Sequence, residues 1–497
     1  MGYMDQTTTI RFLESGVLGP APVARRTTSL SELFLAGDAV YKLKRAVTLP
    51  YVDFSHLAAR KWSCEREVAL NRRTAPGLYL GVVAVTRDGA GLALDGPGEP
   101  VDYLVHMRRF DEATLFDTMA DRGRLTDRHI IQLADQLAAF HDRLEPLRDR
   151  GGHKAMARAI ANVVKAATGR QVAQTARIEA LATGWRALLG EGGPRLDSRR
   201  RHGWVRECHG DLHLANICLV DGQPTPFDCI EFNDDLACID TAYDLAFPVM
   251  DLMAHQRHGL ANLLLNRYLC VTQDYTALPV MRLFIAARAL VRACVTAMED
   301  RHADVCRAYL DVAEANMAGP APRLIAIGGR SGTGKSTLAG QLAGPCDAIW
   351  LRTDMIRKAM LGARPEEKLP ETAYSREVTE RTYRRLTRTA LRALADGWPV
   401  ILDAVFLKPE ERAEAARIAR LAGVPFDGLW LEAPVELRAE RVSNRRGDAS
   451  DADATIARLQ EDMEAGAITW RRIDVSGELQ ETVKRARAAL ATGNGSS

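Results

Sequence analysis

Residues 324–343 read LIAIGGRSGTGKSTLAGQLA, and this stretch decides the fold of the second half of the chain. Its first part is apolar, as in a buried strand, and its last part has the spacing of a helix. Between them lie Gly329, Gly332 and Gly334, followed by Lys335 and Ser336. Glycines let successive backbone N–H groups turn toward one anion, and the start of the next helix adds its positive dipole end. The stretch therefore predicts a phosphate-binding loop.

The fixed positions Gly329-x-x-x-x-Gly334-Lys335-Ser336 complete the P-loop pattern in its strand-to-helix context. We expect Lys335 to reach the outer phosphates of a nucleotide and the Ser336 hydroxyl to bind magnesium. The predicted ATP contacts of this loop are Gly329, Gly332, Gly334, Lys335, Ser336 and Thr337. The predicted cofactors are therefore ATP and Mg2+.

The sequence changes character at a short proline and glycine break, residues 318–322. Beyond it, candidate strands alternate with helix-length stretches, which is typical of a parallel sheet. The candidate strands are 324–327, 348–351, 399–402 and 428–431. We therefore predict a linker at 318–322, an α/β P-loop domain with a parallel sheet at 323–490, and a tail at 491–497.

A second group of polar residues follows the next predicted strands. Asp354 and Arg357 in LRTDMIRK are three residues apart on a helix, so both can face one ligand. Such a carboxylate can take a proton from an attacking hydroxyl while the arginine holds the acceptor molecule. Asp403 ends another strand, where open parallel sheets bind their ligands, and Arg412 lies on the helix after it.

On these residues the segment 323–490 resembles the small P-loop kinases, among them polynucleotide 5′-kinase, gluconate kinases, chloramphenicol phosphotransferase and the zeta toxins. The resemblance implies that Asp354 is the base, that Lys335 is catalytic, and that Arg357 contacts the acceptor. The remaining substrate and lid residues that it implies are Asp403, Arg412, Arg438, Arg441 and Arg445. Lid arginines neutralise charge on the transferred group.

The strongest feature of the first half is HGDLHLAN at residues 209–216. Asp211 and Asn216 are spaced as in the protein-kinase loop H-R-D-x-x-x-x-N, and Asp228 follows twelve residues after Asn216. In phosphoryl transfer the first residue orients and deprotonates the acceptor hydroxyl, while the other two hold magnesium. We therefore predict Asp211 as catalytic, with Asn216 and Asp228 as metal ligands.

These motifs, with FDCIEF at 227–232 in place of D-F-G, resemble the aminoglycoside phosphotransferases and their choline and fructosamine kinase relatives. The resemblance spans roughly residues 30–315. It implies an α+β kinase-like domain with a small β lobe at 1–110 and a helical lobe at 111–317. No G-x-G-x-x-G precedes the strand that should carry the ATP-binding lysine.

That lysine is one of two candidates. Lys42 and Lys44 lie on one face of the strand AVYKLK, so the period of two does not choose between them. We favour Lys42, which follows Val40 as the kinase lysine follows alanine in V-A-I-K. Glu67 on the next helix is its predicted partner, with Glu65 as the alternative.

Composition limits the function classes. The 66 basic and 64 acidic residues give 497 residues a net charge of +2, so a dedicated nucleic-acid or membrane-surface binder is not expected. Nine cysteines without a C-x-x-C pair argue against disulfides and structural zinc. Apolar runs fall short of the roughly 18 residues of a membrane span. We expect a soluble cytoplasmic protein.

The order of the halves resembles a bacterial family of fused proteins, an aminoglycoside-phosphotransferase-like domain followed by a P-loop kinase or AAA-type ATP-binding domain. The leading hypothesis is an ATP-dependent phosphotransferase with two nucleotide sites that acts on hydroxyl groups of small molecules such as sugars. The alternatives are a single P-loop kinase with a ligand-sensing pseudokinase, or a nucleotide-driven, toxin-like regulator. Acceptor identity, nucleotide preference and oligomeric state stay open, and an oligonucleotide 5′-end is one of the acceptors to test.

Overall fold

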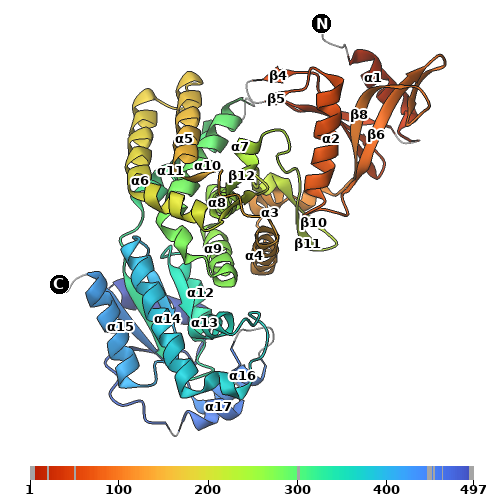
Figure 1. Cartoon of the computed structure of the whole chain (residues 1–497). Coiled ribbons are helices and arrows are strands. Elements are labelled where there is room, and N and C mark those ends of the chain that lie inside the picture. The colour runs from red at the N-terminus through yellow and green to blue at the C-terminus, as the bar shows by residue number, and fades with distance from the viewer. Residues whose placement is uncertain are drawn as a thin grey trace. The chain divides into compact units, whose positions relative to one another are not determined.

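The computed structural model describes residues 6–19, 22–49, 52–298, 303–444, 450–451, 454–461 and 463–491 (Figure 1). Its contacts divide the chain into two compact units. Unit 1 comprises residues 1–161 and 196–251, and unit 2 comprises 162–195 and 252–497. The predicted linker at 318–322 lies inside unit 2, because the helices that precede it pack with the P-loop sheet.

Unit 1 contains a six-stranded antiparallel sheet in the order β1-β2-β3-β8-β6-β7. Its strands are β1 (Ala24–Thr27), β2 (Ser31–Ala36), β3 (Ala39–Lys44), β6 (Tyr79–Asp88), β7 (Gly91–Leu94) and β8 (Glu99–Arg108). Strands β2 and β3 form a hairpin, which closes with Ala36 opposite Ala39 around Gly37 at φ 56°. Helix α2 (Leu57–Asn71) packs on β6 and β8 through buried residues that include Cys64 and Val68.

The rest of unit 1 is helical with short strand pairs. Thr126 caps α4, because its hydroxyl accepts the His129 N–H at 3.4 Å. The elements are α1 (Thr7–Phe12), β4 (Thr48–Leu49), β5 (Val52–Asp53), α3 (Phe116–Asp121), α4 (Asp127–Asp142), β9 (Val205–Glu207), β10 (Ile217–Val220), β11 (Gln223–Pro226), α7 (Asp234–Ala237) and β12 (Cys238–Asp240). Helices α5 (Gly152–Gly169), α6 (Thr175–Arg201) and α8 (Thr241–Ala254) contribute residues to both units.

Unit 2 contains a five-stranded parallel sheet in the order β14-β15-β13-β16-β17. The strands are β13 (Leu324–Gly329), β14 (Ile349–Arg352), β15 (Val400–Asp403), β16 (Phe426–Glu432) and β17 (Arg471–Asp474). The predicted fold class, an α+β part with a small β lobe followed by an α/β part with a parallel sheet, is confirmed. The sequence missed β17, because its polar RRID pattern resembles an exposed loop.

The helices of unit 2 are α9 (His258–Thr272), α10 (Leu278–Met298), α11 (Ala303–Ala318), α12 (Lys335–Ala343), α13 (Thr353–Met360), α14 (Arg376–Ala395), α15 (Pro409–Ala422), α16 (Val435–Ser443), α17 (Ala454–Leu459) and α18 (Leu479–Ala491). Helices α14 and α15 lie side by side (Figure 1). None of the helices in the described ranges is long and apolar enough to cross a membrane.

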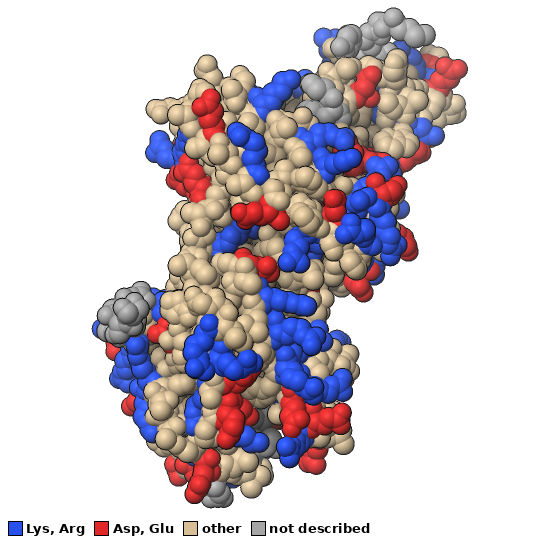
Figure 2. Space-filling model, turned by 60° about the vertical axis from the view of Figure 1, so that its left-hand side comes forward, with Lys and Arg blue, Asp and Glu red and all other residues tan. Residues whose placement is uncertain are grey.

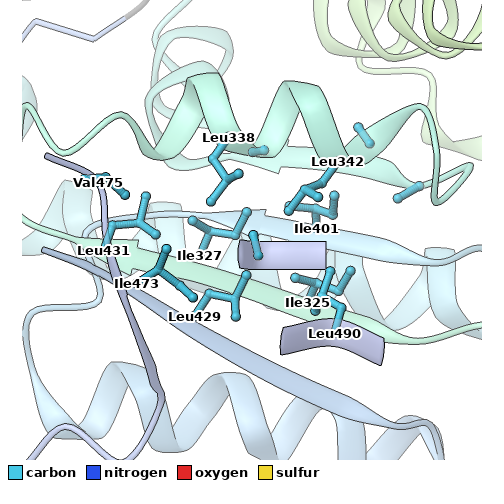
Figure 3. Packing of buried hydrophobic residues seen from close by; sticks show 14 residues of the cluster. Ile325, Ile327, Leu338, Leu342, Ile401, Leu429, Leu431, Ile473, Val475 and Leu490 are labelled. Carbon is cyan, nitrogen blue, oxygen red and sulfur yellow. The ribbon is translucent and has the colours of Figure 1, made fainter. Parts of the chain in front are cut away.

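The two faces of the parallel sheet carry different cores, as the strand period of two requires. Ile325 and Ile327 of β13 point toward Leu338 and Leu342 of α12, and the same apolar layer includes Leu490 of α18 (Figure 3). The other face is aromatic. A Cβ at Gly428 would come within 2.4 Å of the Trp470 side chain, so this glycine makes room for an indole.

Edge strand β14 is covered by α9. The Trp350 N–H donates to Asn266 Oδ1 at 2.7 Å, and Asn266 Nδ2 donates to the Ala348 carbonyl at 3.0 Å. Asn262, one turn earlier, donates to the same carbonyl at 3.1 Å. Both asparagines are buried. An uncovered edge strand is a site for unwanted strand pairing. Helix α9 therefore protects this edge of the P-loop sheet.

Replacing Asn266 should therefore loosen β14. Asn266→Ala leaves the Trp350 N–H without its partner, which costs about 1–3 kcal/mol. We expect faster amide hydrogen exchange in β14, and unchanged exchange in the control Asn162→Ala, an exposed asparagine of α5. Equal protection of β14 in both variants would show that α9 does not support this strand.

Candidate functional sites

The loop that follows β9 in unit 1 brings Asp211 and Asn216 together. Asn216 Nδ2 donates to the Asp211 carbonyl at 2.9 Å and to its Oδ2 at 3.1 Å. His213 Nε2 lies 3.4 Å from the same carboxylate oxygen. The buried Asp244 of α8 holds the base of this loop by accepting the N–H of Gly210 at 2.9 Å. The backbone and side chains thus fix the direction of the Asp211 carboxylate.

Asp228 is brought beside this loop by the β10–β11 hairpin. The Phe227 N–H donates to the Asn216 carbonyl at 2.9 Å, so residues 216 and 228 lie at the same end of the hairpin. Asp228 has a φ of 64°, and its N–H donates to the Tyr79 hydroxyl at 3.1 Å. A left-handed backbone with a Cβ costs about 1 kcal/mol, so neighbouring contacts must hold it.

Lys42 joins this group, and Lys44 does not reach Asp228. Lys42 Nζ lies 2.9 Å from Glu67 Oε1 and 2.6 Å from Asp228 Oδ1. Lys44 is buried, and its ammonium contacts Glu67 and lies 2.5 Å from Glu231 Oε1. Glu65, the alternative partner, is exposed beside Lys61. The structure therefore brings together Lys42, Glu67 and Asp228, as the sequence argument favoured.

Electrostatic interactions keep Lys42 and Asp228 charged. Burial opposes ionisation of Asp228, but the Lys42 charge and hydrogen bond hold the pKa of Asp228 below its usual value. Burial likewise opposes the charge of Lys42, yet Asp228 and Glu67 hold the pKa of Lys42 well above its ordinary range. Lys42 and Asp228 therefore form an ion pair at neutral pH.

In unit 2 the three P-loop glycines are needed for different reasons. Gly329, Gly332 and Gly334 all have positive φ, at 144°, 86° and 82°. A Cβ at Gly332 would lie 2.5 Å from the Arg438 carbonyl, and one at Gly329 would lie 2.7 Å from the Leu431 carbonyl. A Cβ at Gly334 would meet nothing within 4 Å. Packing thus requires the first two glycines, whereas Gly334 borders open space at the start of α12.

The rest of the loop folds around that space. Lys335 Nζ donates to the Arg330 carbonyl at 3.1 Å, so the ammonium reaches back across the loop. Ser336 and Thr337 begin α12, half-buried and exposed respectively. On the outer side, Gln460 Oε1 accepts the Ser331 N–H at 2.7 Å, and its carbonyl accepts Arg330 Nε at 2.8 Å. Sequence reasoning missed Gln460, which no motif marks.

Two carboxylates lie near the ends of β14 and β15. Burial raises the pKa of Asp354, and Asp403 adds to that rise while Arg352 and Lys335 oppose it. Asp403 is buried, and its Oδ2 lies 3.3 Å from Trp350 Nε1 and 3.6 Å from Arg352 Nε. A carboxylate with a raised pKa is a stronger base than an ordinary carboxylate. Both predicted residues therefore belong to one charged cluster with Lys335.

The predicted arginines are held mostly by backbone. Arg357 donates from Nη1 to the Ala373 carbonyl at 2.8 Å and stacks on Tyr374, with 4.8 Å from its guanidinium carbon to the ring centroid. Arg412 donates hydrogen bonds of 2.6–3.1 Å to backbone carbonyls, those of Phe406, Leu407, Ala465 and Ala467. These contacts are structural, and the predicted substrate roles of Arg357 and Arg412 stay predictions.

The two lid arginines that the structure describes also donate hydrogen bonds to backbone carbonyls. Arg438 is buried and donates from Nη1 to the Ser331 carbonyl of the P-loop at 3.3 Å, while its Nη2 contacts Glu461. Arg441 Nη2 donates to the Val475 carbonyl at 2.8 Å. Arg445 lies outside the described residues. Of the two that the structure describes, Arg438 bonds directly to the phosphate-binding loop, and Arg441 bonds to the carbonyl of Val475.

The residues present fit magnesium. Asn216 uses its amide N–H groups on Asp211, which leaves its carbonyl oxygen as a ligand atom. In unit 1 Asp228 adds a carboxylate oxygen to this set, and in the separate site of unit 2 Ser336 offers a hydroxyl oxygen. Oxygen ligands are what this ion prefers. The open space beside Gly334 fits a phosphate group next to Ser336.

The thiol nearest Asp228 in the chain is that of Cys229. All nine cysteines are free, and seven of them are buried. Burial raises the pKa of the Cys229 thiol, next to Asp228, to about 12. A thiol with such a pKa stays neutral and unreactive at neutral pH.

Basic and acidic side chains are interspersed on the face drawn in Figure 2. This agrees with the small net charge of +2. Charge on this face is therefore mixed rather than of one sign.

Comparison with known proteins assigns a domain class to the second half of the chain. Residues 324–465 match a protein family described as an AAA domain, so the second half contains a P-loop domain of that kind. The chain as a whole belongs to the family of the "Uncharacterized protein Rv2004c" of Mycobacterium tuberculosis, with 31% identity over 482 residues, covering 93% of this chain and 94% of that protein. A Mycobacterium bovis protein matches to the same extent.

Two solved structures are similar to parts of this chain. A gluconokinase from Sinorhizobium meliloti is 23% identical, covering 34% of this chain and 93% of that one, with a TM-score of 0.27. A choline/ethanolamine kinase family protein from Mesorhizobium loti is 16% identical, covering 63% of this chain and 96% of that one, with a TM-score of 0.36.

Substitutions of Lys42 and Lys44 should have different effects. Lys42→Met removes the cation beside Asp228, so nucleotide affinity of unit 1 should fall about tenfold or more while the fold persists. Lys44→Met leaves Glu231 buried without its cation, which should destabilise unit 1 by about 3 kcal/mol or more. Binding and thermal unfolding measured on both variants check this. A stable Lys44→Met protein that fails to bind nucleotide would assign the site to Lys44.

Asp354 predicts a pH dependence. A base works only when deprotonated, and burial raises its pKa, so turnover at the P-loop site should fall on acidification at a higher pH than an ordinary carboxyl would give. The measurement is kcat against pH. In Asp354→Asn the acid limb should disappear along with most of the turnover. An unchanged acid limb in that variant would move the base to another residue, with Asp403 next.

Proposed function

We propose that this protein is an ATP-dependent phosphotransferase with two nucleotide sites, one in each unit, that phosphorylates hydroxyl groups of small molecules, sugars among them. The observation that carries the proposal is the assembled group in unit 1. There Asp211 is held by Asn216, and Asp228 is paired with Lys42. A unit that only senses a ligand has no need of an oriented carboxylate beside a metal-binding pair.

In unit 1 the proposed steps use this chain's own residues. Asp211 orients the acceptor hydroxyl and takes its proton, with its carboxylate held by Asn216 and His213. Lys42, fixed by Glu67, binds the nucleotide phosphates. Asn216 and Asp228 would hold magnesium, which neutralises charge on the phosphates when it is bound.

In unit 2 the loop N–H groups and Lys335 bind the nucleotide phosphates, and Asp354 takes the proton of the acceptor hydroxyl. The charge cluster of Asp354, Asp403 and Arg352 supports this assignment. Ser336 would hold magnesium at this site. Arg438 supports the loop from behind through the Ser331 carbonyl.

The decisive experiment silences one site at a time in the full-length chain. Lys335→Ala removes the P-loop cation and should reduce turnover in unit 2 by about 100-fold or more. We expect residual acceptor-dependent ATP consumption in this variant, measured against sugars, aminoglycosides, nucleosides and oligonucleotide 5′-ends. That remainder should vanish when Asp211→Asn is added, with nucleotide binding in unit 1 retained.

The same assay separates the rival functions. If Lys335→Ala binds nucleotide in unit 1 but consumes no ATP with any acceptor, unit 1 is a sensor and the two-site proposal is wrong. If wild-type ATP consumption needs a macromolecular partner rather than a small acceptor, the nucleotide-driven regulator is the better account.

A further inference from the structure

Segment 227–231, which carries Asp228, is held along its whole length. Phe227 O lies 2.9 Å from His209 Nε2, and the Ile230 N–H donates to the His209 carbonyl at 3.0 Å. The Cys229 N–H donates to Asn71 Oδ1 at 2.8 Å, and the Glu231 carbonyl accepts Arg66 Nε at 3.0 Å. The left-handed residue Asp228 thus lies within a segment fixed on both sides.

One face of α2 supplies the contacts of Asn71 and Arg66 and adds two more residues. Ser63, Arg66, Glu67 and Asn71 follow the spacing of a single helix face. Ser63, Glu67 and Asn71 are completely buried. Three of the four contact segment 227–231 directly, and Glu67 contacts it through Lys42. The helix therefore fixes both the lysine and the aspartate of the site.

Glu231 closes this arrangement. Its Oε1 accepts the Ser63 hydroxyl at 2.7 Å and lies 2.5 Å from Lys44 Nζ. The side chain is buried, and Lys44 also contacts Glu67. One carboxylate thus ties the segment to both α2 and β3, three residues after Asp228.

We propose that Glu231 is a positioning residue for nucleotide binding in unit 1, which keeps Asp228 directed at Lys42 and at the magnesium of the nucleotide. This inference rests on the nucleotide site proposed above. It assigns to Glu231 a role beyond balancing the charge of Lys44. The two roles differ in their effect on magnesium, because only displacement of Asp228 removes a metal ligand.

The test uses the full-length chain with Lys335→Ala, and ADP as the probe. The dissociation constant is measured by calorimetry with and without Mg2+. Glu231→Gln should raise it about tenfold in Mg2+ and bring the ratio of the two values close to one. Ser63→Ala keeps every charge and removes one hydrogen bond to Glu231, so a rise of about fivefold is expected. Glu145→Gln, an exposed glutamate of unit 1, is the matched control and should match the parent.

A double variant distinguishes positioning from charge balance. Lys44→Met with Glu231→Leu replaces a buried ion pair by apolar groups, which often preserves stability. Positioning predicts that this variant still lacks the magnesium dependence, whereas charge balance predicts its recovery. Recovery in the double variant, or parental values in both Glu231→Gln and Ser63→Ala, overturns the proposal. A parent that binds no ADP overturns the nucleotide site itself, which is a different result.

Discussion

A left-handed backbone residue lies at the centre of each site, and its neighbours have to hold it there. In unit 2 the residue is Gly334, with a φ of 82°, where no Cβ is present to be strained. In unit 1 it is Asp228, with a φ of 64°, and here the side chain is needed. The conformational cost at Asp228 is met by Tyr79, Asn71 and the ion pair with Lys42.

Under the proposed function, both units would face the same electrostatic problem with different residues. Phosphate charge in unit 1 would meet one lysine, already paired with two carboxylates. In unit 2 it would meet backbone N–H groups and Lys335, and Arg438 packs behind the loop. The relatives match across 93% of this chain, so both units occur together in that family. Helix α9 precedes the P-loop strand by more than fifty residues, yet it covers the edge of the P-loop sheet.

Local patterns predicted the local parts of this structure well. Glycine spacing identified the loop at 329–336, and strand and helix periods located four strands of the parallel sheet. The Asp211–Asn216 spacing marked a pair that the structure joins by a hydrogen bond. Residues that act through tertiary contacts could not be found in this way. Ser63 and Asn71 belong to no motif, although their spacing on α2 was a usable signal. Glu231 lies in the FDCIEF stretch, but that stretch does not reveal its contacts with Ser63 and Lys44. Likewise, sequence alone does not tell that Gly332 is required by the Arg438 backbone while Gly334 borders open space.

The central claim is that one chain binds two nucleotides at independent sites. Calorimetric titration of the full-length protein with ADP and Mg2+ tests it most directly. The account predicts two nucleotides bound per chain, one after Lys335→Ala, one after Asp228→Ala, and none when the two substitutions are combined. A wild-type stoichiometry of one, abolished by a single substitution, would contradict it.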